Sequence, residues 1–417
     1  MNRREFLQVS GQLAAFGASA SLTSVAETVA AGSELAPWQP GFLDIHHINT
    51  GRGNSTLTVM PDGTSLLIDA GASGTQGPAM NPARPDGSRR PGQWIARYVE
   101  RQLKAASRAG LNYALLTHLH GDHIGDVTPE CPKSIYGNFK ISGISEVAEV
   151  MHIGKIIDRG YPKYNYPAKV ADSTGLNYIQ FAMAASRRGM GVEQIKVGSS
   201  RQIALVHEPE RYPEFRVRVI AGNGQAWNGE GENAVPRFPS QHGETAEKLA
   251  SENSCSIALR LSYGRFSYFT GGDLTSDTNY GRDPWRDIES PAAKMAGRVS
   301  VSTCNHHGYF DANGPDFVRA LRPRVWILQS WHASHPAMPV LANLYSPILY
   351  PGPRDVFCLG LHPAAALSCA RFSDLFKSSQ GHVLVRVASA GAEFFVLVLE
   401  DGDESNHVKA VFGPYTC

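Results

Sequence analysis

Charge is scarce in this sequence. Of its 417 residues, 18% are charged, against about 25% in an average soluble domain. The 39 lysines and arginines almost balance the 38 aspartates and glutamates, which leaves a net charge of +1. This balance excludes a strongly basic nucleic-acid clamp and a polybasic membrane-binding surface. With 42% apolar residues, the chain is not a disordered polymer, and it is long enough for a substantial core.

Cysteines and long apolar runs are also scarce. The six cysteines are Cys131, Cys255, Cys304, Cys358, Cys369 and Cys417. No two of them form a Cys-x-x-Cys pair, which disfavours a thiolate zinc site or a redox motif, and we expect most to be buried free thiols. No segment beyond the N-terminus reaches about 18 apolar residues in a row, so we expect no transmembrane span in the mature protein.

The first 31 residues have the pattern of an export signal. Arg3 and Arg4 precede Phe6, and a weakly apolar stretch rich in small residues follows. This order is typical of a secretory signal, and the paired arginines resemble a twin-arginine signal. We therefore expect the twin-arginine export machinery as a partner and a periplasmic or secreted location in a bacterium. Loss of residues 1–30 would remove two arginines and two glutamates, so the net charge would stay +1.

The rest of the chain carries strand and helix signals without a repeat. Apolar residues at helical spacing predict a helix over 93–109 and another near 315–321, and apolar runs bounded by turn residues predict strands. The predicted strands cover 42–48, 55–60, 64–69, 112–117, 202–207, 216–221, 255–262, 265–270, 299–304, 324–329, 382–388 and 393–399. Blocks of strands with helices between them favour an α/β (α+β) fold of two packed sheets with helices outside.

Three parts follow from these signals. Residues 1–31 are the export signal and a linker, residues 40–400 form one domain, and residues 401–417 form a C-terminal tail. Within the domain, 160–250 has few periodic signals, and we interpret it as an insertion that shapes a substrate groove.

Three histidines and an aspartate stand within six residues, directly after a predicted buried strand. The segment reads Thr117-His118-Leu119-His120-Gly121-Asp122-His123. Imidazole nitrogens and carboxylate oxygens are ligands that suit zinc, iron or manganese. The spacing of His118 and His120 places both rings on one side of an extended segment. Gly121 would let the chain turn, so that Asp122 and His123 reach a second ion about 3.5–4 Å away.

This pattern resembles the His-x-His-x-Asp-His signature of the metallo-β-lactamase superfamily. Further segments agree in order: a strand ending at Asp69 and Gly71, a strand ending at Asp273, and His306-His307 before a glycine. The resemblance covers about residues 42–400. It implies a four-layer αββα sandwich and a hydrolase domain with two divalent metal ions.

A closer resemblance is to the hydrolase domain of ComEC-type DNA-uptake proteins and their secreted relatives, with phosphorylcholine esterases of teichoic acid in the same neighbourhood. It rests on the stretch 48–55, on Asn253 and Ser256, and on His335-Pro336 after His-His-Gly. The membrane portion of those uptake proteins is missing, so we do not expect a channel.

The resemblance implies roles for the candidate site residues. The implied metal ligands are His118, His120, Asp122, His123, Asp273 and His307, with His306 as the alternative to His307 or as a neighbour that supports the ligands or faces the substrate. Asp69 would orient a metal-bound imidazole from outside. His335 would donate a proton to the leaving group or hold an anion, with an ordinary loop histidine as the alternative. A ligand expected between the first cluster and Asp273 is missing, and His207, His242, Asn253 or a water is left to fill that place.

The implied chemistry is hydrolysis by a metal-bound hydroxide, with Asp122 and Asp273 orienting it and taking its proton. Zinc is the expected metal, and manganese or iron are the alternatives. The ComEC-type resemblance implies a phosphoester substrate. We expect a small molecule or a cell-envelope component, because a neutral protein is poorly suited to extended nucleic acid. A lactam, lactone or amide hydrolase and a non-catalytic metal-binding module are the competing hypotheses.

Overall fold

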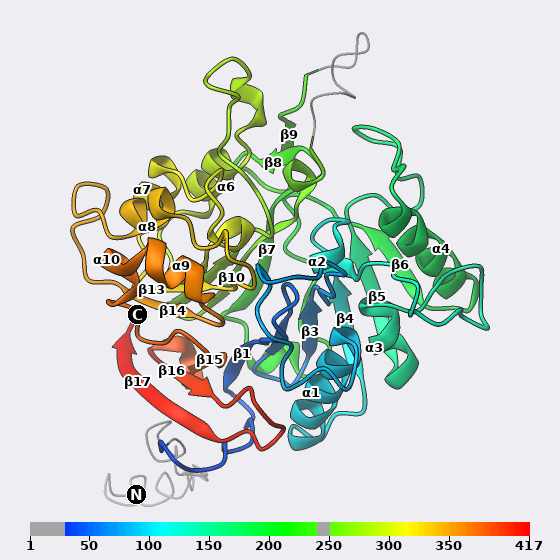
Figure 1. Cartoon of the computed structure of the whole chain (residues 1–417), viewed down its shortest axis with the longest axis horizontal. Helices are drawn as coiled ribbons and strands as arrows, with labels where there is room; N and C mark the ends of the chain where they lie inside the picture. The colour runs from blue at the N-terminus through cyan, green and yellow to red at the C-terminus, as the bar shows by residue number, and fades with distance from the viewer. Residues whose placement is uncertain (1–29, 240–250) are drawn as a thin grey trace, which may run out of the picture.

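The computed structural model describes residues 30–239 and 251–417, and its centre is two large sheets packed face to face (Figure 1). In neighbour order, the nine-stranded sheet consists of β17 (Val408–Thr416), β16 (Glu393–Leu399), β15 (His382–Val387), β1 (Leu43–His47), β2 (Thr56–Val59), β3 (Ser65–Ile68), β4 (Leu111–Leu115), β5 (Ile153–Asp158) and β6 (Gly191–Gln194). The eight-stranded sheet consists of β14 (Asp355–Cys358), β13 (Val325–Leu328), β12 (Val301–Thr303), β11 (Phe266–Thr270), β10 (Ala258–Tyr263), β7 (Phe215–Gly222), β8 (Gln225–Trp227) and β9 (Ala234–Pro236).

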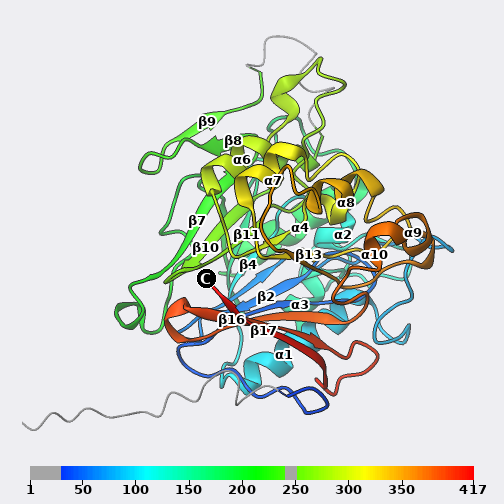
Figure 2. The ribbon, with the colours of Figure 1, turned by 90° about the vertical axis from the view of Figure 1, so that its left-hand side faces the viewer.

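Helices cover the outer face of each sheet, so the molecule has four layers (Figure 2). The nine-stranded sheet is covered by α1 (Pro91–Ala105), α3 (Ile144–Val150) and α4 (Ser173–Arg187), and the eight-stranded sheet by α6 (Glu289–Ala296), α7 (Pro315–Leu321) and α8 (Met338–Leu344). Shorter helices are α2 (Gly121–Ile124), α9 (Pro363–Ser368) and α10 (Ala370–Ser373). The predicted αββα sandwich is confirmed.

Three apolar clusters hold these layers together. Side chains from the inner faces of both sheets, such as Ile45 and Leu259, form the cluster between the sheets. A second cluster joins the nine-stranded sheet to its helices, and a third joins the eight-stranded sheet to its helices. α1 shows the local cause: Pro91 starts it, and Ile95 and Val99 lie one turn apart on its buried face.

Several predicted elements lie where the sequence placed them, and others do not. The hairpin of 55–60 and 64–69 forms as β2 and β3, and the predicted helix near 315–321 forms as α7. No strand forms over 202–207, whereas 173–187, which has no strong apolar period, forms α4. The stretch 160–250 also contributes β6 to one sheet and β7, β8 and β9 to the other, so its described part is built into the sandwich.

The expected C-terminal tail is part of the sheet. β17 pairs with β16 in antiparallel register, for example Leu397 with Val411. β17 is an edge strand, and only part of its length is buried. Its polar and apolar residues therefore do not alternate cleanly, so the sequence carried only a weak strand signal. Among the described residues, no helix combines the length and the apolar character that a membrane span requires.

The candidate site residues follow the ends of parallel strands. β3 and β4 run parallel, as do β11, β12 and β13 in the other sheet. The segments that follow β3, β4, β11 and β12 meet at one edge of the sandwich, where the backbone N–H of Ile257 donates to the carbonyl of Thr117 over 3.0 Å. The carboxyl ends of parallel strands are a common place for ligand sites.

Candidate metal centre

The segment after β4 carries the histidine cluster, and close backbone contacts hold it. The carbonyl of Asp122 accepts the N–H of Asn54 over 2.8 Å, and the carbonyl of His123 accepts the N–H of Ala70 over 2.8 Å. A Cβ atom added to Gly53 or to Gly71 would lie 2.2 or 2.0 Å from the Asp122 carbonyl oxygen. Only glycine therefore fits at these two positions.

Gly121 is needed for a different reason from the predicted turn. Its φ is not in the left-handed region, but a Cβ there would lie 1.9 Å from Oδ1 of Asp126. The close approach of the Asp126 carboxylate, rather than backbone turning, requires glycine at this position.

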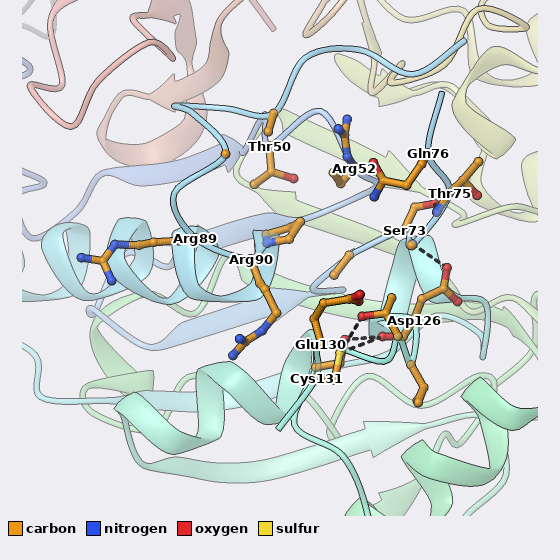
Figure 3. A pocket seen from close by; sticks show the side chains of 18 of the residues that line it. Thr50, Arg52, Ser73, Thr75, Gln76, Arg89, Arg90, Asp126, Glu130 and Cys131 are labelled. Atoms are coloured by element: carbon orange, nitrogen blue, oxygen red, sulfur yellow. Dashed lines mark hydrogen bonds between the residues drawn. The ribbon is translucent and has the colours of Figure 1, made fainter. Parts of the chain in front are cut away.

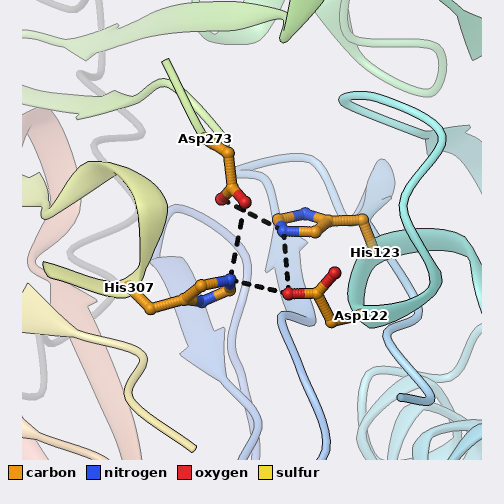
Figure 4. A group of neighbouring side chains, drawn as sticks. All are labelled: Asp122, His123, Asp273 and His307. Atoms are coloured by element: carbon orange, nitrogen blue, oxygen red, sulfur yellow. Dashed lines mark hydrogen bonds and ion pairs between the residues drawn. The ribbon is translucent and has the colours of Figure 1, made fainter. Parts of the chain in front are cut away.

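Four side chains converge on one point between the two sheets (Figure 4). Asp122 and His123 come from α2, Asp273 follows β11, and His307 follows β12. Nε2 of His307 lies 2.8 Å from Oδ2 of Asp122, and Nε2 of His123 lies 3.1 Å from Oδ1 of Asp273. All four ligand atoms lie within 4.8 Å of one another, as in a site that can hold one metal ion.

Asp273 also belongs to a second group. Its carboxylate joins His118 and His120, with all three ligand atoms again within 4.8 Å of one another. Nε2 of His118 lies 3.6 Å from Oδ2 of Asp273 and 3.1 Å from Nδ1 of His120. His118 is buried, and His120 is exposed at the surface of the site. The two groups, here called the four-residue group and the three-residue group, therefore share one carboxylate.

These residues fit a pair of divalent cations. Nε2 of His123 and Oδ1 of Asp273 are both buried, and neither has a hydrogen-bond partner among the described residues. Buried polar atoms without partners are costly, and a cation between them satisfies both. The donor set of imidazole and carboxylate suits zinc, manganese or iron.

Asp69 holds His123 from behind. Its Oδ2 accepts Nδ1–H of His123 over 2.7 Å, and both of its oxygens accept bonds from Thr117. The bond fixes the tautomer, so the lone pair on Nε2 of His123 faces the four-residue group. Asp69 therefore contacts a ring of the cluster from outside, and its role toward a metal-bound imidazole stays a prediction.

His307 is oriented by two partners that the sequence analysis did not assign. Its Nδ1 lies 3.0 Å from Oδ1 of Asn54 and 3.3 Å from the carbonyl oxygen of Gln329. Both are acceptors, so Nδ1 carries the proton and Nε2 faces Asp122. Asn54 stands in the 48–55 stretch that carries the ComEC resemblance, and this was the available signal.

The carboxylates of the site raise the pKa of the histidines that face them. Burial alone would lower the pKa of His123, but the carboxylates of Asp273, Asp69 and Asp122 outweigh it and hold that pKa well above its usual value. His307 behaves similarly: burial lowers its pKa, but Asp273 and Asp122 raise it to about 9. The carboxylates therefore demand positive charge at this point, which protons supply when metal does not.

Of the candidates for the ligand expected between the first cluster and Asp273, the structure places His207 away from the site and Asn253 beside it. His207 is exposed, and its backbone N–H donates to Asp62 at the β2–β3 turn, at the other end of β3 from Asp69. It cannot join the site, so this alternative is wrong. His242 lies outside the described residues. Asn253 does lie at the site, with Nδ2 3.3 Å from Nε2 of His306.

His335 lies directly beside the four-residue group. Its ring stacks on His307 with centroids 5.0 Å apart and an interplanar angle of 28°. Burial and the nearby ring of His307 hold the pKa of His335 well below its usual value, so the ring is neutral. Its role in catalysis stays a prediction.

Glu252 is a further residue that the sequence analysis missed. Its carboxylate accepts the backbone N–H of Leu119, between His118 and His120, over 2.9 Å, and pairs with the buried guanidinium of Arg159. It therefore anchors the segment that carries the three-residue group. Only its place next to Asn253 could have pointed to it.

A cavity of about 940 Å³ lies beside the segment that follows α2 (Figure 3). Arg52, Arg89, Arg90 and Trp94 line it, and Asp126 reaches it from the end of α2. The guanidinium of Arg90 pairs with Glu146, and that of Arg89 lies 5.4 Å from the ring centroid of Trp94. None of the metal-ligand candidates is among the residues that line this cavity.

Comparison with known proteins agrees with this site. Residues 48–147 match the family model described as metallo-beta-lactamase superfamily, and this range includes Asp69 and the whole cluster from His118 to His123. The chain carries a metallo-beta-lactamase superfamily domain. Asp273 and His307, which complete the site, lie beyond the matched range. No curated protein sequence matches the chain.

Solved structures that resemble this chain are distant in sequence. A mutant of the CmlA beta-hydroxylase is 11% identical, with a TM-score of 0.39 over 84% of this chain and 54% of that one. The metallo-beta-lactamase fold protein YhfI from Bacillus subtilis is 13% identical, with a TM-score of 0.31 over 84% of this chain and 98% of that one. Zn²⁺-bound PqqB from Methylobacterium extorquens is 10% identical, with a TM-score of 0.36 over 82% and 99%. The chain thus spans about half the length of the CmlA chain.

Proposed function

We propose that the protein is a metal-dependent hydrolase that acts on a small phosphoester with two divalent ions, zinc in the first place. The observation that carries the proposal is the shared carboxylate of Asp273, which joins the four-residue group and the three-residue group. Two adjacent ions, when bound, activate water and stabilise negative charge on a phosphoryl or acyl centre.

The residues of the chain divide the remaining work. His118, His120, Asp122, His123, Asp273 and His307 hold the ions, and Asp69 orients His123. Asp122 and Asp273 are the proton acceptors within the site. His335 accepts the backbone N–H of Trp331 at Nδ1, so its Nε2 carries the proton and can donate to a leaving group.

The cavity beside α2 supports an anionic substrate. Arg52, Arg89 and Arg90 line it. Arg90 pairs with Glu146 and Arg52 donates to the carbonyls of Gly51 and Asn81, so the exposed Arg89 is the guanidinium placed to meet a phosphate. The net charge of +1 supports a small molecule or a cell-envelope phosphoester over a long nucleic acid. The resemblance to ComEC-type hydrolase domains is the second support for phosphoester chemistry.

Three substrates distinguish the hypotheses. We expect purified, metal-loaded protein to hydrolyse bis-p-nitrophenyl phosphate, whereas a lactam or lactone hydrolase would act on nitrocefin or on a chromogenic lactone. Hydrolysis of nitrocefin alone would overturn the phosphoester proposal. A protein with two bound ions that hydrolyses none of the three would favour the non-catalytic module.

We also propose that the protein is exported by the twin-arginine machinery to the periplasm or the exterior. Arg3 and Arg4, which support this, lie outside the described residues. An Arg3→Lys, Arg4→Lys variant should stay in the cytoplasm of its native host, because paired arginines are the feature that the export receptor reads. Export at the wild-type level would contradict the proposal.

A further inference from the structure

His306 stands beside the shared carboxylate but belongs to neither metal group. Its Nε2 lies 3.7 Å from Oδ2 of Asp273, almost the same distance as Nε2 of His118 at 3.6 Å. Both distances are too long for hydrogen bonds. They are close to the separation of two ligand atoms on one tetrahedral ion, about 3.4 Å for ligands at about 2.1 Å.

The tautomer of His306 is fixed by Asp311. Nδ1 of His306 lies 2.6 Å from Oδ1 of Asp311, and a carboxylate can only accept, so Nδ1 carries the proton. When neutral, the ring presents the lone pair of Nε2 toward Asp273 and toward Nδ2 of Asn253, which lies 3.3 Å away and can donate to it. A metal ion beside Asp273 would take that lone pair in place of the Asn253 amide.

The backbone is bent to aim this ring. His306 and His307 both adopt left-handed conformations, with φ of 46° and 56°. Residues other than glycine adopt this conformation only at an energetic cost. The bend turns His307 toward Asp122 and brings Nε2 of both rings near Oδ2 of Asp273, at 3.6 Å for His307 and 3.7 Å for His306, with the ring centroids 6.0 Å apart.

We propose that His306 is the third imidazole ligand of the ion held by His118, His120 and Asp273, and that Asp311 is the carboxylate that orients it. The missing ligand would then come from the His-His-Gly segment after β12, and the two adjacent histidines would serve one ion each. This inference rests on the proposed two-metal site. Because His306 stands outside the three-residue group, its ring should move toward the ion when metal binds.

Asn253 is the competing ligand, and it provides a matched comparison. Its Oδ1 is buried and has no hydrogen-bond partner among the described residues. Its Nδ2 faces Nε2 of His306, which makes it a neighbour of the proposed ligand. Under the proposal, loss of the Asn253 side chain spares the metal and loss of the His306 ring does not.

The test measures metal binding in the full chain. His306→Gln, Asp311→Asn, Asn253→Ala and a control at exposed His152 (His152→Gln) are loaded with zinc, and bound metal is counted during titration with a competing chelator. We expect His306→Gln to bind one of its two ions at least about tenfold more weakly, and Asp311→Asn to lose about 10–100-fold at the same ion. Asn253→Ala and the control should match wild type, and His306→Gln should change the visible spectrum of the cobalt-loaded protein.

Wild-type behaviour of His306→Gln in both titration and cobalt spectrum would overturn the proposal, as would loss of the ion in Asn253→Ala alone. Should His306→Gln fail to fold, a crystal structure of metal-loaded wild type decides instead, with an ion at about 2.1 Å from Nε2 of His306 as the expected result. An ion farther than hydrogen-bond distance from that atom would contradict it. Intact metal binding with altered KM in His306→Gln would show a substrate-facing role. Absence of phosphoester hydrolysis would fail the proposed function and leave this ligand assignment standing.

Discussion

Oδ1 of Asp273 lies 3.1 Å from Nε2 of His123, and neither buried atom has a hydrogen-bond partner among the described residues. The ring of His123 cannot turn to improve the contact, because Asp69 holds its Nδ1. The other oxygen of Asp273, Oδ2, lies 3.6 Å from Nε2 of His118, 3.6 Å from Nε2 of His307 and 3.7 Å from Nε2 of His306. One carboxylate therefore faces ligand atoms of both groups, which is the geometry of a residue that bridges two cations.

Replacement of that carboxylate should remove both ions. Asp273→Asn keeps the size of the side chain but loses the charge, so we expect less than one bound ion per chain and a fall in phosphodiesterase kcat on the order of 10²–10³ or more. Bound metal and initial rates with bis-p-nitrophenyl phosphate measure the two effects. Asp277→Asn, at an exposed position a few residues on, is the control. Two tightly bound ions in Asp273→Asn would refute the bridging role.

Asp69→Asn should weaken binding without abolishing it. Asp69 touches no proposed substrate position but fixes the ring of His123 through a 2.7 Å bond. Outer partners of this kind are worth about 10–100-fold in metal affinity. Competition with a chelator measures the loss, and circular dichroism checks that the fold is retained. An unchanged affinity would mean that packing alone orients His123.

Arg89→Gln should raise the KM for a phosphodiester severalfold and leave kcat nearly unchanged. The side chain lines the cavity beside α2 and lies far enough from the ligands that it touches none of them. Steady-state kinetics separate the two constants. Arg201→Gln, which changes an exposed arginine paired with Glu232, should behave as wild type. Equal KM values in all three proteins would exclude the cavity as the binding place.

Acid should destabilise the fold through histidines behind the site. Burial holds the pKa of His46 and of His47 at about 4 and that of His382 at about 3. These values lie below the ordinary value, so between pH 6.5 and 4 the unfolded chain binds more protons and stability falls as pH falls. As pH falls from 6.5 to 5, each of these histidines should lower the free energy of unfolding by about 2 kcal/mol, because it is protonated in the unfolded chain but not in the folded one.

Urea unfolding at several pH values measures this slope. His47→Gln keeps a donor and an acceptor for Val383 and Tyr268 but cannot titrate, so its slope should be shallower than that of wild type by about one ring's share. His207→Gln, at an exposed position, should leave the slope unchanged. Superimposable profiles for His47→Gln and wild type would contradict the assignment.

Sequence alone predicted the sandwich and most of the site because both depend on short-range patterns. Asp69, the 118–123 cluster, Asp273 and His307 stand in recognisable segments at strand ends. The roles of Asn54 and Asp311 could not be predicted from the sequence. Asn54 contacts His307, which is 253 residues further along the chain. Asp311 contacts His306 because the chain bends in the left-handed conformation at His306 and His307. α4 was missed because four of its six buried residues are small, namely three alanines and Gly175, and give little apolar contrast. β17 was missed because an edge strand needs only partial burial.

The most direct test of the account is a metal titration of the metal-free protein, with phosphodiesterase activity and bound ions measured at every step. The account predicts that chelated protein is inactive, that two ions bind per chain, and that hydrolysis of bis-p-nitrophenyl phosphate reaches its maximum only when the second ion is bound. Full activity in the chelated protein, or two bound ions without hydrolysis, would contradict it.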